Sequence, residues 1–126
     1  MTIESEFQQI WNVTAAEDLS GSGSMFKAVS IAGTIAAGPA LAIGILRSKG
    51  VSGQQVSAVM KGVTKVMVGA AVSTLGHPLK IAATSGWLVA AASGDVHVGR
   101  ALATAASGDL IPAAVDFSTK PAWPGV

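Results

Sequence analysis

Residues 81–117 read IAATSGWLVAAASGDVHVGRALATAASGDLIPAAVDF, and this stretch decides the fold class. Short apolar segments in it are separated by turns built on Ser-Gly pairs. Gly adopts positive φ at little cost, and Ser and Asp hydrogen-bond to backbone in turns, so each pair is expected to reverse the chain. The words AASGDV from Ala91 and AASGDL from Ala105 recur fourteen residues apart, which is one strand plus one turn. The stretch predicts a β-meander that ends in a strong strand.

Alternating apolar residues predict strands over the rest of the chain as well. The expected strands are residues 25–31, 41–46, 56–60, 63–72, 79–83, 87–91, 96–103 and 110–117. Lys61 and Gly62 are expected to break the run between residues 56 and 72. A helix over residues 54–67 is the alternative, but five valines and Thr64 between residues 56 and 68 favour strands.

The last expected strand has a clear alternation. Ile111, Ala113, Val115 and Phe117 would face one way. Pro112 lacks a backbone N–H, so this strand is expected at a sheet edge or at a bulge.

The amino-acid composition limits which classes of protein this chain can belong to. The 126 residues suit one domain, and the absence of Cys excludes disulfides, thiolate metal sites and Cys nucleophiles. Hydrophobic residues reach 50% while charged residues are only 12%, which is few for the surface of a free monomer. This balance indicates a surface kept for other protein, or an Ala-rich β domain with no such role.

Charge is unevenly distributed along the chain. Residues 1–18 hold four acids and no Lys or Arg, giving −4; residues 19–126 hold eight cations against three Asp, giving +5. The cations are scattered singly without interleaved aromatics, so no nucleic-acid groove is expected.

Residues 28–46 carry no charge over a length that would suit a membrane helix. Pro39 and several glycines interrupt this run, so no membrane span is expected there. The acidic N-terminus has no positive region typical of a signal peptide.

Three regions are predicted: an N-terminal arm and flexible linker (1–24), a β domain (25–118) and a C-terminal tail (119–126). The arm carries large apolar residues, which fit either a short amphipathic helix or an extended tail; these are Ile3, Phe7, Ile10 and Trp11. A Ser-Gly repeat at residues 20–24 has the composition of a linker. The C-terminal tail carries Trp123.

Few residues suggest chemistry. His77 and His97 lack the spacing of metal ligands, and no nucleophile elbow or phosphate-binding fingerprint occurs. Asp95 and Asp109 occupy equivalent turn positions, where a bond to the following backbone is expected. We therefore expect neither an enzyme nor a bound cofactor or metal.

The order of several short words resembles the head-decoration, or capsid cement, proteins of tailed bacteriophages. The resemblance runs from Ala15 to Phe117, about four-fifths of the chain. Its words are AAEDLS at 15–20, KAV at 27–29, LAIGIL at 41–46, GAAV at 69–72, TSGWLV at 84–89, SGD at 93–95, VGRAL at 98–102 and the last strand.

The resemblance implies an all-β protein with a small β-barrel or β-tulip domain, an extended N-terminal arm and a short C-terminal tail. It also implies a non-catalytic virion protein on the outer capsid surface, bound to the major capsid protein. Such proteins are most often homotrimers and sometimes dimers. The long arm bearing Trp11 departs from the family pattern and leaves the symmetry open.

Two sets of contact residues follow as hypotheses. The expected capsid contacts are Ile3, Phe7, Ile10, Trp11, Glu17 and Asp18. The expected contacts between copies are Val66, Val68 and Trp123. The competing functions are a free-standing β-sandwich module that binds carbohydrate or peptide, and a small membrane-associated protein.

Overall fold

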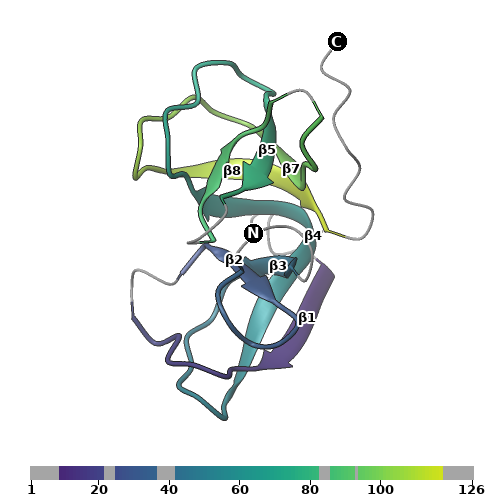
Figure 1. The fold of residues 1–126 in the computed structure, drawn as a ribbon, viewed down its shortest axis with the longest axis vertical. Helices are drawn as coiled ribbons and strands as arrows, with labels where there is room; N and C mark the ends of the chain where they lie inside the picture. Colours follow the sequence, from purple (N-terminus) through teal and green to yellow (C-terminus); the bar gives the residue numbers. More distant parts are fainter. Residues whose placement is uncertain (1–8, 22–24, 37–41, 83–85, 93, 118–126) are drawn as a thin grey trace, which may run out of the picture.

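The computed structural model describes residues 9–21, 25–36, 42–82, 86–92 and 94–117. These residues form strands joined by turns, which confirms the all-β fold class (Figure 1). The strands are β1 (Gln9–Thr14), β2 (Ala28–Ser30), β3 (Ala42–Leu46), β4 (Gln55–Met67), β5 (Pro78–Ile81), β6 (Leu88–Ala90), β7 (Gly99–Ala101) and β8 (Leu110–Asp116). Among the described residues, no helix has the length and apolar character needed to cross a membrane.

All eight strands belong to one sheet with antiparallel pairings. Its order is β2-β3-β4-β8-β7-β5-β6, and β1 also pairs with β4. Beyond the end of β4, Val68 bridges to Leu88 of β6, and the N–H of Gly69 donates to the Leu88 carbonyl at 3.0 Å. The sheet therefore curls into a nearly closed barrel, as the resemblance implied.

β4 connects the two halves of the molecule. It begins beside β1 and β3 in the lower half of Figure 1 and curves upward to pair with β8. The expected break at Lys61 and Gly62 is wrong, because both residues stay paired, with Asp116 and Val115 of β8. Gly62 has a φ of 129°, a value open to glycine, so the strand bends there without ending.

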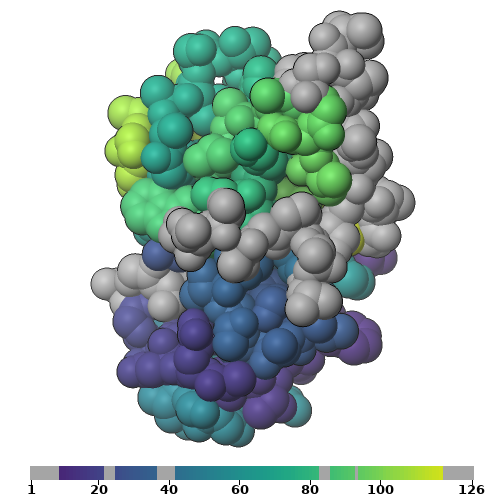
Figure 2. Space-filling view, viewed as in Figure 1, coloured from purple at the N-terminus to yellow at the C-terminus, as the bar shows by residue number. Residues whose placement is uncertain are grey.

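Buried side chains form two clusters, and β2, β3 and β4 contribute residues to both. The larger fills the barrel and includes Ile45, Val59, Val66, Leu79, Leu88 and Ile111. The smaller joins β1, β2, β3 and the start of β4 through Val13, Leu19, Val29, Leu46, Val56 and Ala58. On the face seen in the space-filling view, the early chain, purple and blue, lies below and the green segments lie above (Figure 2).

The order of the last strands differs from a simple meander. β5 and β6 form the expected hairpin, with Leu79 opposite Ala90. β7 then pairs with β5 on its other side, and β8 lies between β7 and β4. This order lets β8 pair along the second half of β4, from Met67 to Lys61, which extends the contact between distant parts of the chain.

The expectation for Pro112 is also wrong, because β8 is an interior strand without a register shift. Its alternation is nevertheless as expected, since Ile111, Ala113, Val115 and Phe117 are buried. The Pro112 carbonyl accepts from the N–H of Leu102, just past the end of β7. The ring nitrogen faces the same side, so no N–H is missing from the ladder with β4.

Part of the expected arm and linker packs against the sheet. β1 is a strand, so the extended alternative holds for the described part of the arm. After β1, the N–H of Ala15 donates to the Gln54 carbonyl and that of Leu19 to the Gly50 carbonyl, each at 2.8 Å. Leu19 is fully buried, so the chain is fixed as far as this residue.

Candidate interaction surface

The β1 strand presents large apolar side chains to solvent. Ile10 is 39% and Trp11 53% exposed, and as neighbours in a strand they point to opposite sides of the sheet. β1 pairs with β4, and no other strand of the described residues pairs with its second edge. An extended segment added to this edge would cover both side chains.

Glu17 and Asp18 follow this strand and are exposed. Glu17 Oε1 accepts from the N–H of Ile35 at 3.3 Å. Asp18 accepts from the hydroxyl and the N–H of Ser20, and these bonds, in that order of size, lower the pKa of its carboxyl. Both acids therefore hold backbone in place while remaining open to a partner.

The other expected contact residues do not join this surface. Ile3, Phe7 and Trp123 lie outside the described residues. Val66 and Val68 are fully buried in the barrel core. Both side chains lie on the inward face of β4 and its continuation, so neither is exposed on the surface of the single chain.

Three turns of the chain have the same geometry. In residues 92–95 and 106–109 an Asp carboxylate accepts from the N–H three residues earlier, each at 2.9 Å. Gln54 does the same with the N–H of Val51, and in all three turns the third residue is a glycine with φ near 90°. The predicted Asp bond is thus present but runs to the preceding backbone, and the copy at residues 51–54 is one that the Ser-Gly-Asp pattern did not find.

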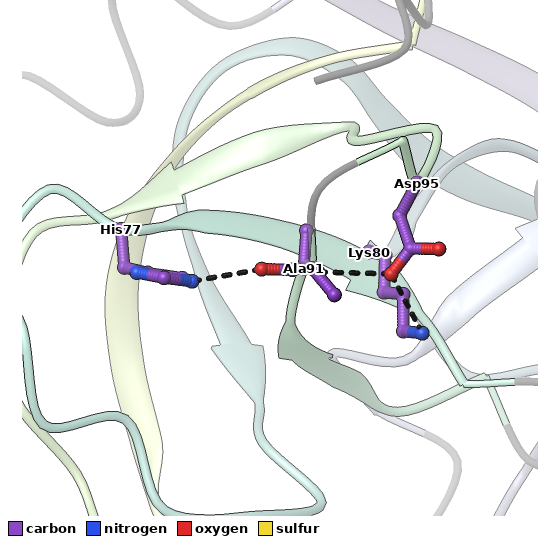
Figure 3. A network of polar contacts seen from close by, with 5 residues as sticks. His77, Lys80, Ala91 and Asp95 are labelled. Atoms are coloured by element: carbon purple, nitrogen blue, oxygen red, sulfur yellow. Dashed lines mark hydrogen bonds and ion pairs between the residues drawn. The ribbon is translucent and has the colours of Figure 1, made fainter. Parts of the chain in front are cut away.

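Asp95 also connects its turn to β5 (Figure 3). Its Oδ2 lies 2.9 Å from Lys80 Nζ, and His77 Nε2 lies 2.9 Å from the Ala91 carbonyl. The hydrogen bond from Lys80, followed by that from the Ala92 N–H, lowers the Asp95 pKa. The histidine and the ion pair therefore fix the chain segment that follows β6, between Ala91 and Asp95.

A hollow of about 280 Å³ opens on the outer side of β7 and β8. His97, Arg100 and Asp116 supply its polar lining, with Val98 and Ala114 between them. His97 Nδ1 is buried without a hydrogen-bond partner among the described residues, and His97 lies outside the strand expected for it. Sequence reasoning missed this hollow, because it brings together residues 97–100 and 114–116, which are fourteen or more positions apart in the chain.

The polar groups in the described residues do not suggest a metal centre. No group of three or more His, Asp or Glu residues gathers among them. Among the described residues that line the hollow there is no Phe, Tyr or Trp, and such side chains are a usual feature of apolar ligand sites.

This chain is similar to a known protein in its fold. No protein-family model matches the sequence, and no curated protein matches it. The fold is similar to that of the head fiber gp8.5 N base in bacteriophage phi29, with a TM-score of 0.65 at 15% sequence identity. The match covers 89% of this chain and 97% of the fiber base. The two chains share a fold.

Proposed function

We propose that this chain is a structural protein of a phage virion that binds the outer surface of the assembled capsid and stabilises it. The observation that supports this best is the fold shared with a phage head fiber base over nearly its whole length. The order of short words that resembles capsid cement proteins points to the same part of a virion. No catalytic or cofactor role is proposed.

Stabilisation by such a protein follows from mass action. A ligand that binds only the assembled shell lowers the free energy of that shell by RT ln(1 + [L]/Kd), so disassembly becomes harder. A copy that contacts two capsid subunits gains further, because its second contact forms at a high effective concentration.

We assign capsid contact to the open edge of β1. Ile10 and Trp11 stand on opposite sides of this edge, so a capsid segment pairing as an added strand would bury both. Glu17 and Asp18 lie beyond the strand and would favour cations on the capsid segment. Ile3 and Phe7 of the arm belong to the same proposed contact.

We also propose that the chain acts as a homotrimer, with a dimer as the alternative. Burial of Val66 and Val68 in the single chain argues against them as subunit contacts, so Trp123 is the contact that we retain. Light scattering on the purified chain measures this directly, and a monomer at all concentrations would contradict a preformed oligomer.

Capsids assembled without this chain provide the functional test. The purified chain should bind them to saturation and raise the temperature at which they release DNA. The Trp11→Ser variant, with a side chain 53% exposed, should fold normally and bind more weakly. Leu75→Ser is the matched control, because Leu75 is 67% exposed but lies in the barrel half, away from β1.

The results distinguish the proposed contact at β1 from the proposed decoration role. Equal binding by both variants would show that β1 is not the contact. Absence of binding by the unmodified chain would overturn the decoration role and favour the free-standing binding module.

A further inference from the structure

The two histidines of the chain differ in their hydrogen bonding. His77 Nε2 lies 2.9 Å from the Ala91 carbonyl oxygen, so backbone holds that ring. The Nδ1 atom of His97 is buried and has no hydrogen-bond partner among the described residues. A buried polar atom without a partner costs free energy, and in a folded protein such an atom often marks a binding role. Since His97 also lines the hollow on β7 and β8, a ligand in the hollow would meet its ring.

A β-bulge at the start of β7 brings His97 to this hollow. Gly99 pairs with Leu79 of β5, and the N–H of Val98 donates to the carbonyl of the same Leu79 at 2.9 Å. Two residues therefore oppose one, which is the arrangement of a β-bulge. Val98 and Gly99 are both buried, so the usual alternation of side chains is interrupted between them. As a result His97 and Arg100, three positions apart, both line the hollow.

Arg100 supplies a positive charge to the hollow. Its side chain is exposed, and its Nη1 donates to the Gly76 carbonyl at 3.1 Å. A guanidinium has five N–H donors, so most of them remain for a ligand. Because the bond to Gly76 already restrains the guanidinium, less side-chain entropy is lost when a ligand binds.

Among the described residues that line the hollow, Asp116 is the only acid. Lys61 of β4 faces it in the ladder, and Lys61 Nζ lies 3.9 Å from Asp116 Oδ2. With Lys61 included, two cations accompany one acid, a net charge of 2 − 1 = +1 with His97 neutral. This balance favours an anion of single charge over a cation.

The size of the hollow also limits the ligand. Its volume of about 280 Å³ is small for a cofactor or drug-sized molecule, whose sites occupy about 300–1,000 Å³. A carboxylate on a short carbon chain is small enough. Its two oxygens match the paired N–H groups of a guanidinium, and an imidazole tautomer with its proton on Nδ1 donates a further hydrogen bond.

We propose that the hollow binds a carboxylate, which Arg100 holds through its guanidinium N–H groups and to which His97 Nδ1 donates. The bound carboxylate gives the buried Nδ1 atom a partner. The carboxylate belongs either to an acidic side chain of another protein or to a free small acid. The site is formed by β7 and β8 and not by the edge of β1, so it does not depend on the proposed capsid binding.

The ring signals of the two histidines test this site by NMR in the full chain. The probes are sodium acetate and a glutamate whose backbone amine is acetylated and whose backbone carboxyl is amidated. At neutral pH and constant ionic strength, each should shift the His97 ring and the amides of Arg100 and Ala114 to saturation. His77 is the internal control, and its ring should not shift. Glutamine blocked in the same way has the same shape without the charge and should bind about tenfold more weakly.

Substitutions distinguish a binding role from a structural one. Arg100→Gln should weaken acetate binding about three- to tenfold, between the values for an exposed ion pair and a charge-assisted hydrogen bond. Lys49→Gln removes an exposed cation between β3 and β4, and this matched control should leave the affinity unchanged.

His97→Phe keeps a planar ring but removes Nδ1, so it should also weaken binding, as measured at the amides of Arg100 and Ala114. The urea midpoint of this variant should stay equal or rise, because an unpartnered buried polar atom is removed. A lower urea midpoint with unchanged affinity would assign His97 a structural role and overturn its part in the site.

The relative affinities of the two probes identify the source of the carboxylate. Binding of the blocked glutamate that equals or exceeds that of acetate supports an acidic side chain of a partner protein. Binding of acetate alone supports a free small acid. Shifts that do not saturate, that affect both histidine rings equally, or that are the same in Arg100→Gln and Lys49→Gln would overturn the proposal. Equal binding of the blocked glutamine would also overturn it, because the site would then not recognise charge.

Discussion

Lys80 Nζ lies 2.9 Å from Asp95 Oδ2, and this ion pair joins the middle of β5 to the turn that follows β6. The same Asp95 oxygen accepts from the Ala92 N–H inside the turn. The equivalent turn at Asp109 has the internal bond, but no ion pair is described for it. Two turns of nearly identical sequence therefore differ in their dependence on charge.

We expect acid to weaken the Asp95 turn. The pKa of this carboxyl is held below its ordinary value of 3.8, so its ionised form is favoured in the folded state. Its contribution to stability is complete above pH 3.8 and is lost as the pH falls from there through the lower folded pKa. Thermal midpoints between pH 7 and pH 2 should fall less for Asp95→Asn than for the unmodified chain.

Asp109→Asn is the control for this measurement, since its turn has the same internal bond and sequence word. An acid profile of Asp95→Asn identical to that of the unmodified chain would show that the ion pair does not contribute to stability in solution.

Gly44 should not tolerate a side chain. A Cβ at this position would lie 2.6 Å from the Val59 carbonyl oxygen of the neighbouring strand. Gly44→Ala is expected to lower the free energy of unfolding by about 1–3 kcal/mol, because overpacking forces backbone shifts. Gly21→Ala, where a Cβ would have no neighbour within 4 Å, should be nearly neutral in the same denaturant titration.

Val68→Asp should unfold the chain rather than dissociate copies of it. Val68 is fully buried at the barrel seam, and an unpaired buried charge costs about 3–5 kcal/mol. Met67→Asp, on the outward side, should cost much less. Circular dichroism and light scattering distinguish the results, and a folded Val68→Asp monomer from a larger parent would favour the original subunit contact.

Leu19 should contribute to stability as a core residue. It is fully buried in the smaller cluster, so Leu19→Ala is expected to cost about 2–5 kcal/mol. Leu75→Ala removes the same atoms from a side chain that is 67% exposed and should have little effect. Equal midpoints for the two variants in urea would mean that the chain is not fixed at Leu19 in solution.

Local patterns in the sequence were sufficient for the all-β class and for the inward face of the last strand. The alternation of Ile111, Ala113 and Val115 predicted a buried face correctly, since side chains alternate with a period of two whatever strands lie alongside. The hairpin of β5 and β6 was likewise predicted from its Ser-Gly turn. Both features depend on residues close together in the chain.

Features that depend on distant partners were missed. Gly62 was expected to end a strand, but pairing with Val115 keeps it in the ladder. Val66 and Val68 were expected to contact another copy, because the sequence does not distinguish an apolar face that meets the core from one that meets a second copy. The hollow near Arg100 required the register of β7 against β8, which no local pattern contains.

The length of β4 has a consequence for how the molecule comes apart. Its first residues, such as Val56, belong to the smaller cluster and its later ones, such as Val66, to the barrel. If either cluster unfolds, β4 loses part of its packing, and the remaining cluster also depends on β4. The two halves are therefore coupled in one cooperative unit, and thermal unfolding should follow a single transition in which calorimetric and van't Hoff enthalpies agree.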